Sequence, residues 1–157
     1  MVYKNVEIQE KMLQFEHFSN EDAINLGNII YQLALEQGVR VSIDISRNGL
    51  TLFHLLMPGT GADNEGWMRR KRNTTCHYQT SSVLFEKSER EGSLVSSGLN
   101  PMDYVAAGGA FPVNLRGTGC IGAVVISGLK GIQDHNLAAQ GIAKLLGVEG
   151  CPNAEFA

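Results

Sequence analysis

Apolar residues recur at helical spacing in two long stretches of the chain. Between Ser19 and Gly38, and again between Asp134 and Gly147, alanine, leucine and isoleucine return every three or four residues. Side chains with this spacing lie on one face of a helix. Ser19 and Asp22 form a capping-box pattern, Asp134 is a common N-cap residue, and the glycine after each stretch can end the helix. The pattern therefore predicts two amphipathic helices with these limits.

A different pattern, with a period of two, occupies the segment between them. Val39–Ile45 alternates apolar and polar residues, which is typical of a strand with one buried face. Asn48 and Gly49 offer the positive φ angles of a two-residue type I′ turn. We therefore expect Leu50–Leu56 to fold back as the hairpin partner.

This turn also predicts a register for His54. If Arg47 pairs with Leu50, regular alternation places His54 opposite Ile43, on the apolar side of the sheet. A histidine in such a position must be hydrogen-bonded or line a cavity.

The second half of the chain predicts another hairpin. Phe111, Val113 and Leu115 alternate in one strand, and Pro112 places that strand at an edge or a bulge. The following segment, 120–126, is nearly continuous in apolar or small residues, as in a central strand covered on both faces. A short glycine-rich link joins the two.

The remaining segments have weaker patterns. Residues 13–18 alternate enough for a first strand, after a short helix within 2–11. Asp63 can cap a helix that runs to about His77, a further helix is expected over 82–90, and 91–100 is predicted to be a mobile loop. Hairpins rather than βαβ units favour an α+β fold, in which helices pack on a mainly antiparallel sheet of about five strands.

Composition adds limits to this picture. The 157 residues suit one domain over 1–157, with 43% hydrophobic and 18% charged residues. The low charged fraction suggests that another copy covers part of the surface, and so a homo-oligomer. A net charge of −3 gives no general attraction to nucleic acid or to an anionic membrane. Without a signal-peptide pattern or an apolar run of transmembrane length, we expect a cytoplasmic protein with three reduced cysteines.

Two charged or glycine-rich motifs invite functional interpretations. Residues 117–122 spell GxGxxG, but a strand follows where a dinucleotide site needs a helix, so a hairpin is favoured. The basic run Arg69–Arg72 points around most of a helical turn and has no aromatic stacking platform, so a nucleic-acid site is not favoured. One helix face does carry Trp67, Arg70, Lys71 and Thr74, and it would suit either an anionic, partly apolar ligand or a structural interface with a partner subunit.

Further candidates each carry two interpretations. Gly108 and Gly109 would let the backbone approach a ligand, or would simply form a turn before the strand with Phe111. Asp134 would cap its helix, while His135 beside it could offer a proton or a ligand bond. A metal or haem site could form if His54, His77 and His135 gathered with Cys76, although the chain has no HxxxH or CxxC spacing.

Several blocks together resemble the GlcG/HbpS-like "haem-degrading domain" family, in its small cytoplasmic branch. The similarity spans about Phe15 to Leu146, and it is the order and spacing of the blocks that is specific. These blocks are Arg47-Asn48-Gly49, Pro58-Gly59-Thr60, Asp63-Asn64 with Trp67 and Arg70–Asn73, Gly108–Val113, Gly122 with Val125–Leu129, and Asp134-His135.

The resemblance implies a profilin-like α+β fold, assembly into dimers or larger rings and, in some relatives, an association with haem. None of His17, His54, His77 and His135 falls in a motif that matches the haem-ligating position of those relatives.

The leading hypothesis is a homo-oligomeric accessory or small-ligand-binding protein. Its pocket for an anionic, partly apolar ligand would be formed by Trp67, Arg70, Lys71, Gly108, Gly109, Phe111 and His135. Two alternatives remain open: a haem-binding or haem-degrading enzyme with a histidine ligand, and a protein-interaction scaffold.

Overall fold

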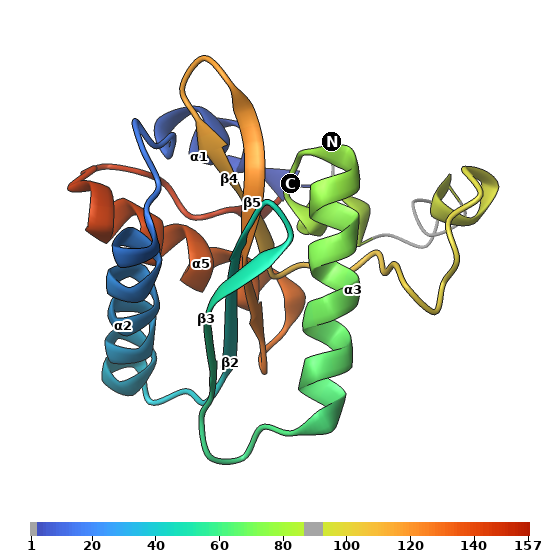
Figure 1. Cartoon of the computed structure of the whole chain (residues 1–157), viewed down its shortest axis with the longest axis horizontal. Coiled ribbons are helices and arrows are strands. Elements are labelled where there is room, and N and C mark those ends of the chain that lie inside the picture. The colour runs from blue at the N-terminus through green and yellow to red at the C-terminus, as the bar shows by residue number, and fades with distance from the viewer. Residues whose placement is uncertain (1–2, 87–92) are drawn as a thin grey trace.

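The structure, a computed structural model, describes residues 3–86 and 93–157. They form three layers, and the middle layer is a four-stranded sheet (Figure 1). Helices α2 (Asn20–Gln37) and α5 (Gly131–Leu146) cover one face of the sheet. Helix α3 (Ala62–Tyr78) covers the other face. Within these ranges, no helix is both long enough and apolar enough to cross a bilayer.

The sheet is fully antiparallel, in the order β3-β2-β5-β4. Its strands are β2 (Ser42–Arg47), β3 (Leu50–Leu56), β4 (Ala110–Leu115) and β5 (Gly119–Ser127). Both predicted hairpins are confirmed, and so are the edge position of β4 and the central position of β5. A separate ribbon of β1 (Tyr3–Lys4) and β6 (Glu155–Phe156) joins the two ends of the chain. The α+β class is therefore confirmed.

Local signals explain why these elements form where they do. Asn48 and Gly49 have φ angles of 52° and 80°, as the type I′ turn requires. Ser19 and Asp22 form the expected capping box, and Gly38 ends α2 in the left-handed conformation. These short-range predictions hold because each is decided within a few residues.

Four boundary predictions were wrong. Residues 13–18 form only a single bridge, Phe15 to Leu115, after helix α1 (Val6–Met12). Helix α3 begins after Gly61 rather than at Asp63, because the Asn64 side chain accepts the Gly61 N–H. In the same way, Gln133 accepts the Lys130 N–H, so Lys130 rather than Asp134 caps α5.

The fourth wrong boundary prediction concerns the segment after α3. A 3₁₀ turn, η1 (Ser82–Phe85), replaces the first part of the helix predicted over 82–90, and residues 87–92 lie outside the described part. Within the predicted loop, residues 93–96 form a helical turn.

The predicted register of His54 was also wrong. Arg47 does pair with Leu50, but a bulge between Ile45 and Ser46 shifts the rest of the hairpin by one residue. His54 therefore lies opposite Asp44, on the face that carries α3. One extra residue in β3 is enough to move every later side chain to the other face.

The two faces of the sheet bury different kinds of side chain. Large apolar residues, including Phe111, Leu26 and Ile30, form the main core between the sheet and helices α2 and α5. Under α3, Met68 packs on the small side chains of Ala110 and Ala123. Lys71, Thr74 and Thr75 of α3 are polar and are buried on that face as well.

Candidate functional site

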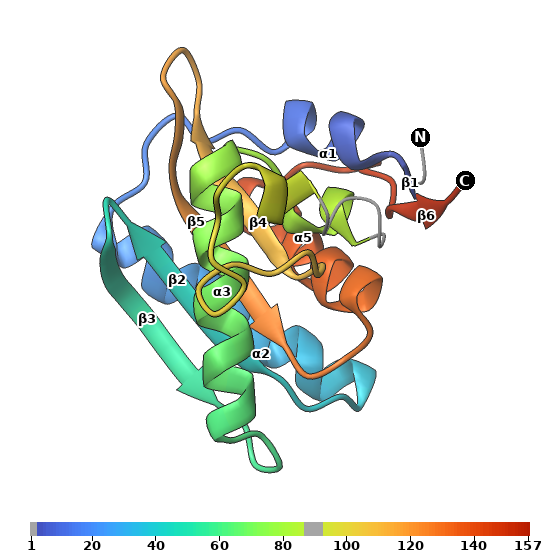
Figure 2. The same ribbon diagram turned by 90° about the vertical axis from the view of Figure 1, so that its right-hand side faces the viewer.

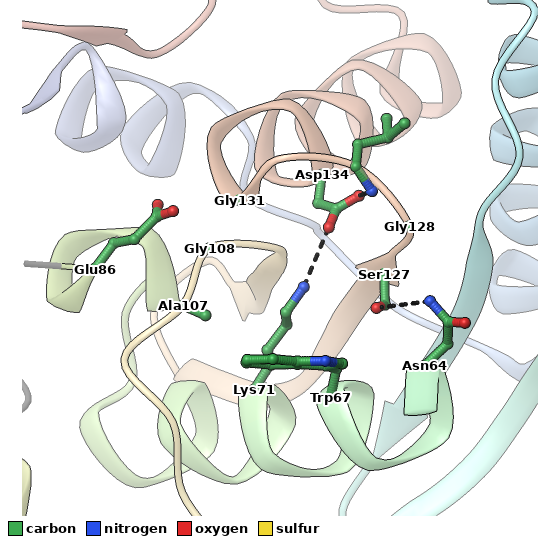
Figure 3. A pocket seen from close by; sticks show the side chains of 11 residues that line it. Asn64, Trp67, Lys71, Glu86, Ala107, Gly108, Ser127, Gly128, Gly131 and Asp134 are labelled. Carbon is green, nitrogen blue, oxygen red and sulfur yellow. Dashed lines mark hydrogen bonds and ion pairs between the residues drawn. The ribbon is translucent and has the colours of Figure 1, made fainter. Parts of the chain in front are cut away.

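A cavity of about 430 Å³ lies between α3, the end of β5 and the beginning of α5 (Figure 3). Eleven residues line it: Asn64, Trp67, Lys71, Glu86, Ala107, Gly108, Ser127, Gly128, Leu129, Gly131 and Asp134. Three of the seven predicted site residues are among them: Trp67, Lys71 and Gly108.

Lys71 and Asp134 form a buried ion pair in this cavity. The Lys71 ammonium donates to Asp134 Oδ2 at 3.2 Å and to the Ile126 carbonyl at 3.0 Å. The other Asp134 oxygen accepts the Leu129 N–H at 3.0 Å. Figure 3 shows the lysine rising from α3 toward the carboxylate at the start of α5.

Burial shifts both partners of the pair toward their neutral forms. It lowers the pKa of Lys71, and it raises the pKa of Asp134 to about 6, against the opposing effects of the partner charge and the hydrogen bonds. Desolvation thus outweighs the mutual attraction, so the pair is weak evidence for stability. Perturbed ionisable groups that line a cavity are instead candidates for a functional site.

The two predicted glycines fit tightly around this pair. Gly109 has φ 132°, and a Cβ atom there would lie 2.7 Å from Lys71 Nζ. A Cβ on Gly108 would lie 2.5 Å from the Gly131 carbonyl oxygen. Gly108 lines the cavity, whereas Gly109 lets the backbone pass against the ammonium group. Neighbouring atoms therefore leave no room for a side chain at either glycine.

Trp67 lines the cavity, and Arg70 stacks on its ring. The Trp67 side chain is 40% exposed, and the Arg70 guanidinium carbon lies 4.5 Å from the centre of its ring. Such stacking is a favourable cation–π contact. Arg70 also lines a second cavity of about 310 Å³, whose other walls are mostly apolar: Leu94, Val95, Leu99, Pro101, Tyr104, Val105 and Ala106. The Trp67–Arg70 pair therefore stands between the two cavities.

Arg70 differs from its three basic neighbours. Arg69 pairs with Asp103, Lys71 with Asp134, and Arg72 with Asp44. Arg70 donates only to the Gly66 carbonyl, and in the described part of the chain it has no carboxylate partner. Among the described residues, no carboxylate therefore pairs with its positive charge.

Phe111 and His135 lie elsewhere. Phe111 points into the main core, because alternation along β4 turns its neighbour Ala110 toward α3 instead. His135 follows Asp134 on α5 and so points about 100° away from it around the helix. Its imidazole is fully buried, bonded through Nε2 to Gln9 Oε1 at 2.6 Å. Neither residue lines the cavity, so the predicted set of seven does not come together.

The sequence interpretation missed several cavity residues. Asn64 donates to the Ser127 hydroxyl at 3.2 Å, and Glu86 accepts the Tyr3 hydroxyl at 3.0 Å. Asn64 could have been found, because it precedes Trp67 by three residues on the same helix face. Glu86 and Ser127 come from distant segments and carried no local signal.

The residues present do not fit a metal or haem at this cavity. Across residues 3–86 and 93–157, no cluster of three His, Cys, Asp or Glu residues is arranged to hold a metal ion. Among the described residues that line the cavity there is no His, Cys, Met or Tyr, which are the side chains that ligate haem iron.

The other histidines and the cysteines are elsewhere. His54 is held by Asp44 at 2.8 Å and by Glu65 at 2.5 Å, in a separate groove of about 490 Å³. All three cysteines are free, as their spacing predicted.

Comparison with known proteins assigns the chain to a family. The family model described as "Haem degrading protein HbpS-like" matches residues 18–143. A UPF0303 protein from Rhizobium johnstonii is 41% identical over 140 residues, which are 88% of this chain and 86% of the relative.

Two solved structures share the fold. The crystal structure of the Ybr137w protein has a TM-score of 0.79 and 27% identity, over 90% of this chain and 88% of that one. A PduOC:heme complex has a TM-score of 0.65 and 20% identity, over 87% and 97%. At 20% identity, the similarity to the PduOC structure shows a shared fold and nothing more. The extent of the family match and the identity of the relative show that this chain belongs to the HbpS-like family.

Proposed function

We propose that this chain is a small-ligand-binding protein, and that its ligand is an anionic, partly apolar molecule held at the Trp67–Arg70 pair. The observation that carries the proposal is the position of Arg70 between two cavities, where no carboxylate of the described residues pairs with its charge. A guanidinium held in place by stacking loses little further freedom when it binds a carboxylate or phosphate. The apolar part of the ligand would enter the second cavity, beside Leu99 and Val105.

The first cavity would recognise a polar group of the same ligand. Asp134 neutralises the ammonium group of Lys71, so Lys71 contributes a hydrogen-bond donor rather than a net charge. Ser127 Oγ accepts from Asn64, which leaves the hydroxyl hydrogen free to donate into the cavity. A mostly apolar site with a few placed polar groups is the usual form of a small-molecule pocket.

Haem is a second candidate, favoured by the neighbour solved as a heme complex. The eleven described residues that line the first cavity include no iron ligand, so we derive no haem chemistry from it. A haem titration distinguishes the two candidates, because a Soret shift that is lost in one single-histidine variant would favour haem.

The proposal can be tested through Trp67, the only tryptophan of the chain. Octanoate and octanol serve as probes with the same apolar chain, one anionic and one neutral. We expect octanoate to change the Trp67 fluorescence saturably, and to bind at least about tenfold more weakly to Arg70→Gln, since a hydrogen bond to a charged group contributes about 1.5–3 kcal/mol.

Arg69→Gln is the matched control, because its arginine already pairs with Asp103. Equal octanoate affinity in the wild type and Arg70→Gln, with both folded by circular dichroism, would remove Arg70 from the site. Equal response to octanol and octanoate would refute an anionic ligand.

A further inference from the structure

Lys71 and Asp134 come from helices on opposite faces of the sheet. Figure 2 shows α3 in front of the sheet, and β5 leading through a loop into α5 behind it. The two side chains meet at the end of β5, where the Lys71 nitrogen lies 3.2 Å from Asp134 Oδ2. Both side chains are almost fully buried, yet both line the first cavity. A small molecule in that cavity therefore meets an amine and a carboxyl group together.

The hydrogen bonds of Lys71 suit a neutral amine. Among the described residues its nitrogen has two acceptors, the Ile126 carbonyl at 3.0 Å and Asp134 Oδ2 at 3.2 Å. An ammonium group has three hydrogens to donate, whereas a neutral amine donates its two hydrogens to these two acceptors. The neutral amine then keeps an unshared electron pair, which a nucleophile requires.

The charges around Lys71 act in both directions, and burial decides between them. Burial lowers the pKa of Lys71, and the charge of Arg70 lowers it further, against the opposing charges of Asp134 and Glu86. Desolvation and a neighbouring cation are two ways in which proteins activate a lysine as a nucleophile. Each unit by which the pKa of a lysine falls toward 7 raises the neutral fraction at neutral pH about tenfold.

Asp134 is placed to move protons at this nitrogen. Burial raises the pKa of Asp134 to about 6, so its carboxyl group can exchange a proton near neutral pH. Its Oδ1 atom accepts the Leu129 N–H at 3.0 Å, which holds the carboxyl group with Oδ2 toward Lys71. Transfer of one proton from the ammonium to Oδ2 gives a free amine beside a carboxylic acid, without any change in the net charge of the pair.

We infer that Lys71 forms an imine with a carbonyl compound in the first cavity, and that Asp134 carries the protons of this reaction. The inference rests on the proposed function for the entry of the ligand's polar group into this cavity, and it identifies that group as the carbonyl of an aldehyde or ketone. The ligand is then an oxo acid with an apolar chain, whose carboxylate binds Arg70.

The reaction balances without an oxidant or a reductant. The Lys71 nitrogen attacks the carbonyl carbon, and the carbonyl oxygen takes the proton of the Asp134 carboxyl group. The nitrogen then returns one proton to Asp134. When the hydroxyl group leaves as water, it takes this proton, and the electron pair of the nitrogen forms the double bond to carbon. The products are one water and an iminium ion beside the Asp134 carboxylate.

Reductive trapping tests the inference. The wild type is incubated at about pH 7 with 2-oxooctanoate or 2-octanone and with sodium cyanoborohydride, which reduces an imine to a stable secondary amine. Peptide mapping by mass spectrometry then locates the adduct among the six lysines of the chain. We expect at least about tenfold more adduct on Lys71 than on any other lysine. No adduct on Lys71 with either probe, or equal adduct on exposed Lys144, would overturn the inference.

Three variants separate the roles of the two side chains. Lys71→Met should abolish the dominant adduct, whereas Lys144→Arg, the matched control, should keep it. Asp134→Asn should slow trapping at least about tenfold, because a general acid–base group contributes about 10²–10⁴ in rate. Loss of the carboxylate alone would free the amine and speed trapping, so slower trapping reports lost proton transfer. An equal or faster rate in Asp134→Asn, with the fold intact by circular dichroism, would overturn the role given to Asp134.

The trapping result is separate from that of the octanoate experiment. Octanoate has only a carboxylate, which forms no imine, and 2-octanone has no charge. Saturable octanoate binding without an adduct on Lys71 would refute the imine and leave the proposed function standing. A 2-octanone adduct on Lys71 in a protein that does not bind octanoate would refute the anionic ligand and support the imine.

Discussion

The buried His135 should make the stability of this protein strongly dependent on pH. Its imidazole is fully buried, and its Nδ1 atom has no hydrogen-bond partner in the described part of the chain. Burial lowers the pKa of His135 from 6.5 to about 3. The folded state therefore holds the neutral ring, while the unfolded chain takes up a proton as the pH falls below 6.5.

The size of the effect follows from linkage. The contribution of neutral His135 is fully present above pH 6.5, and it is lost progressively as the pH falls toward 3. Each pH unit in this window costs about 1.36 kcal/mol, so from pH 7.5 to about pH 4.5 the loss is roughly 2 to 3 kcal/mol. Other groups titrate over the same pH range. A variant without the imidazole is therefore needed to isolate the contribution of His135 to the free energy of unfolding.

Urea unfolding of the wild type and His135→Gln across this pH range provides the test. Glutamine can still donate to Gln9, and any fixed cost of the substitution is the same at every pH. We expect the difference in unfolding free energy to move in favour of the variant by roughly 2 to 3 kcal/mol on acidification.

Ile30→Val is the control, because it removes a core methylene without a titratable group and should cost about 1 kcal/mol at every pH. A difference between wild type and His135→Gln that stays constant from pH 7.5 to 4.5 would refute the reasoning.

Three other predictions concern the groups around α3. Gly109→Ala should lower the unfolding free energy by about 2 kcal/mol or more, measured in urea, because its φ of 132° and the nearby Lys71 ammonium leave no room for a Cβ. Asp134→Ala should cost about 3–5 kcal/mol by leaving a buried lysine unpaired, whereas Lys71→Met with Asp134→Leu should cost less than that single change in the same assay. The pKa of His54 is raised above its ordinary value, because burial lowers it by less than the Glu65 and Asp44 carboxylates raise it. Glu65→Gln should therefore lower the pKa of His54 measured by NMR. An unchanged titration would rule out that contact.

Features decided by adjacent residues could be predicted from the sequence. The Asn48-Gly49 turn and the Ser19 cap need only local backbone preferences, and both formed as expected. The bulge in β3 had no such signal, because leucine suits a regular strand as well as a bulged one, and the register of His54 was lost with it.

The site was harder to predict because it is assembled across long sequence separations. Asp134 looked like a cap, but its partner is an ammonium 63 residues earlier in the chain. Spacing on one helix correctly grouped Trp67 with Lys71, and it could not show that Phe111 turns to the opposite face of the sheet. Helical periodicity gives the direction of a side chain relative to its own helix, while the packing of the layers decides what it meets.

The ribbon that joins the chain ends has a practical consequence for anyone preparing this protein. Tyr3 pairs with Phe156, and its hydroxyl reaches Glu86 in the wall of the first cavity. A group attached beside Tyr3 or Phe156 would therefore lie close to this cavity. Purification tags should be cleaved, or moved to the Thr118 tip of the β4–β5 hairpin, before affinities are compared.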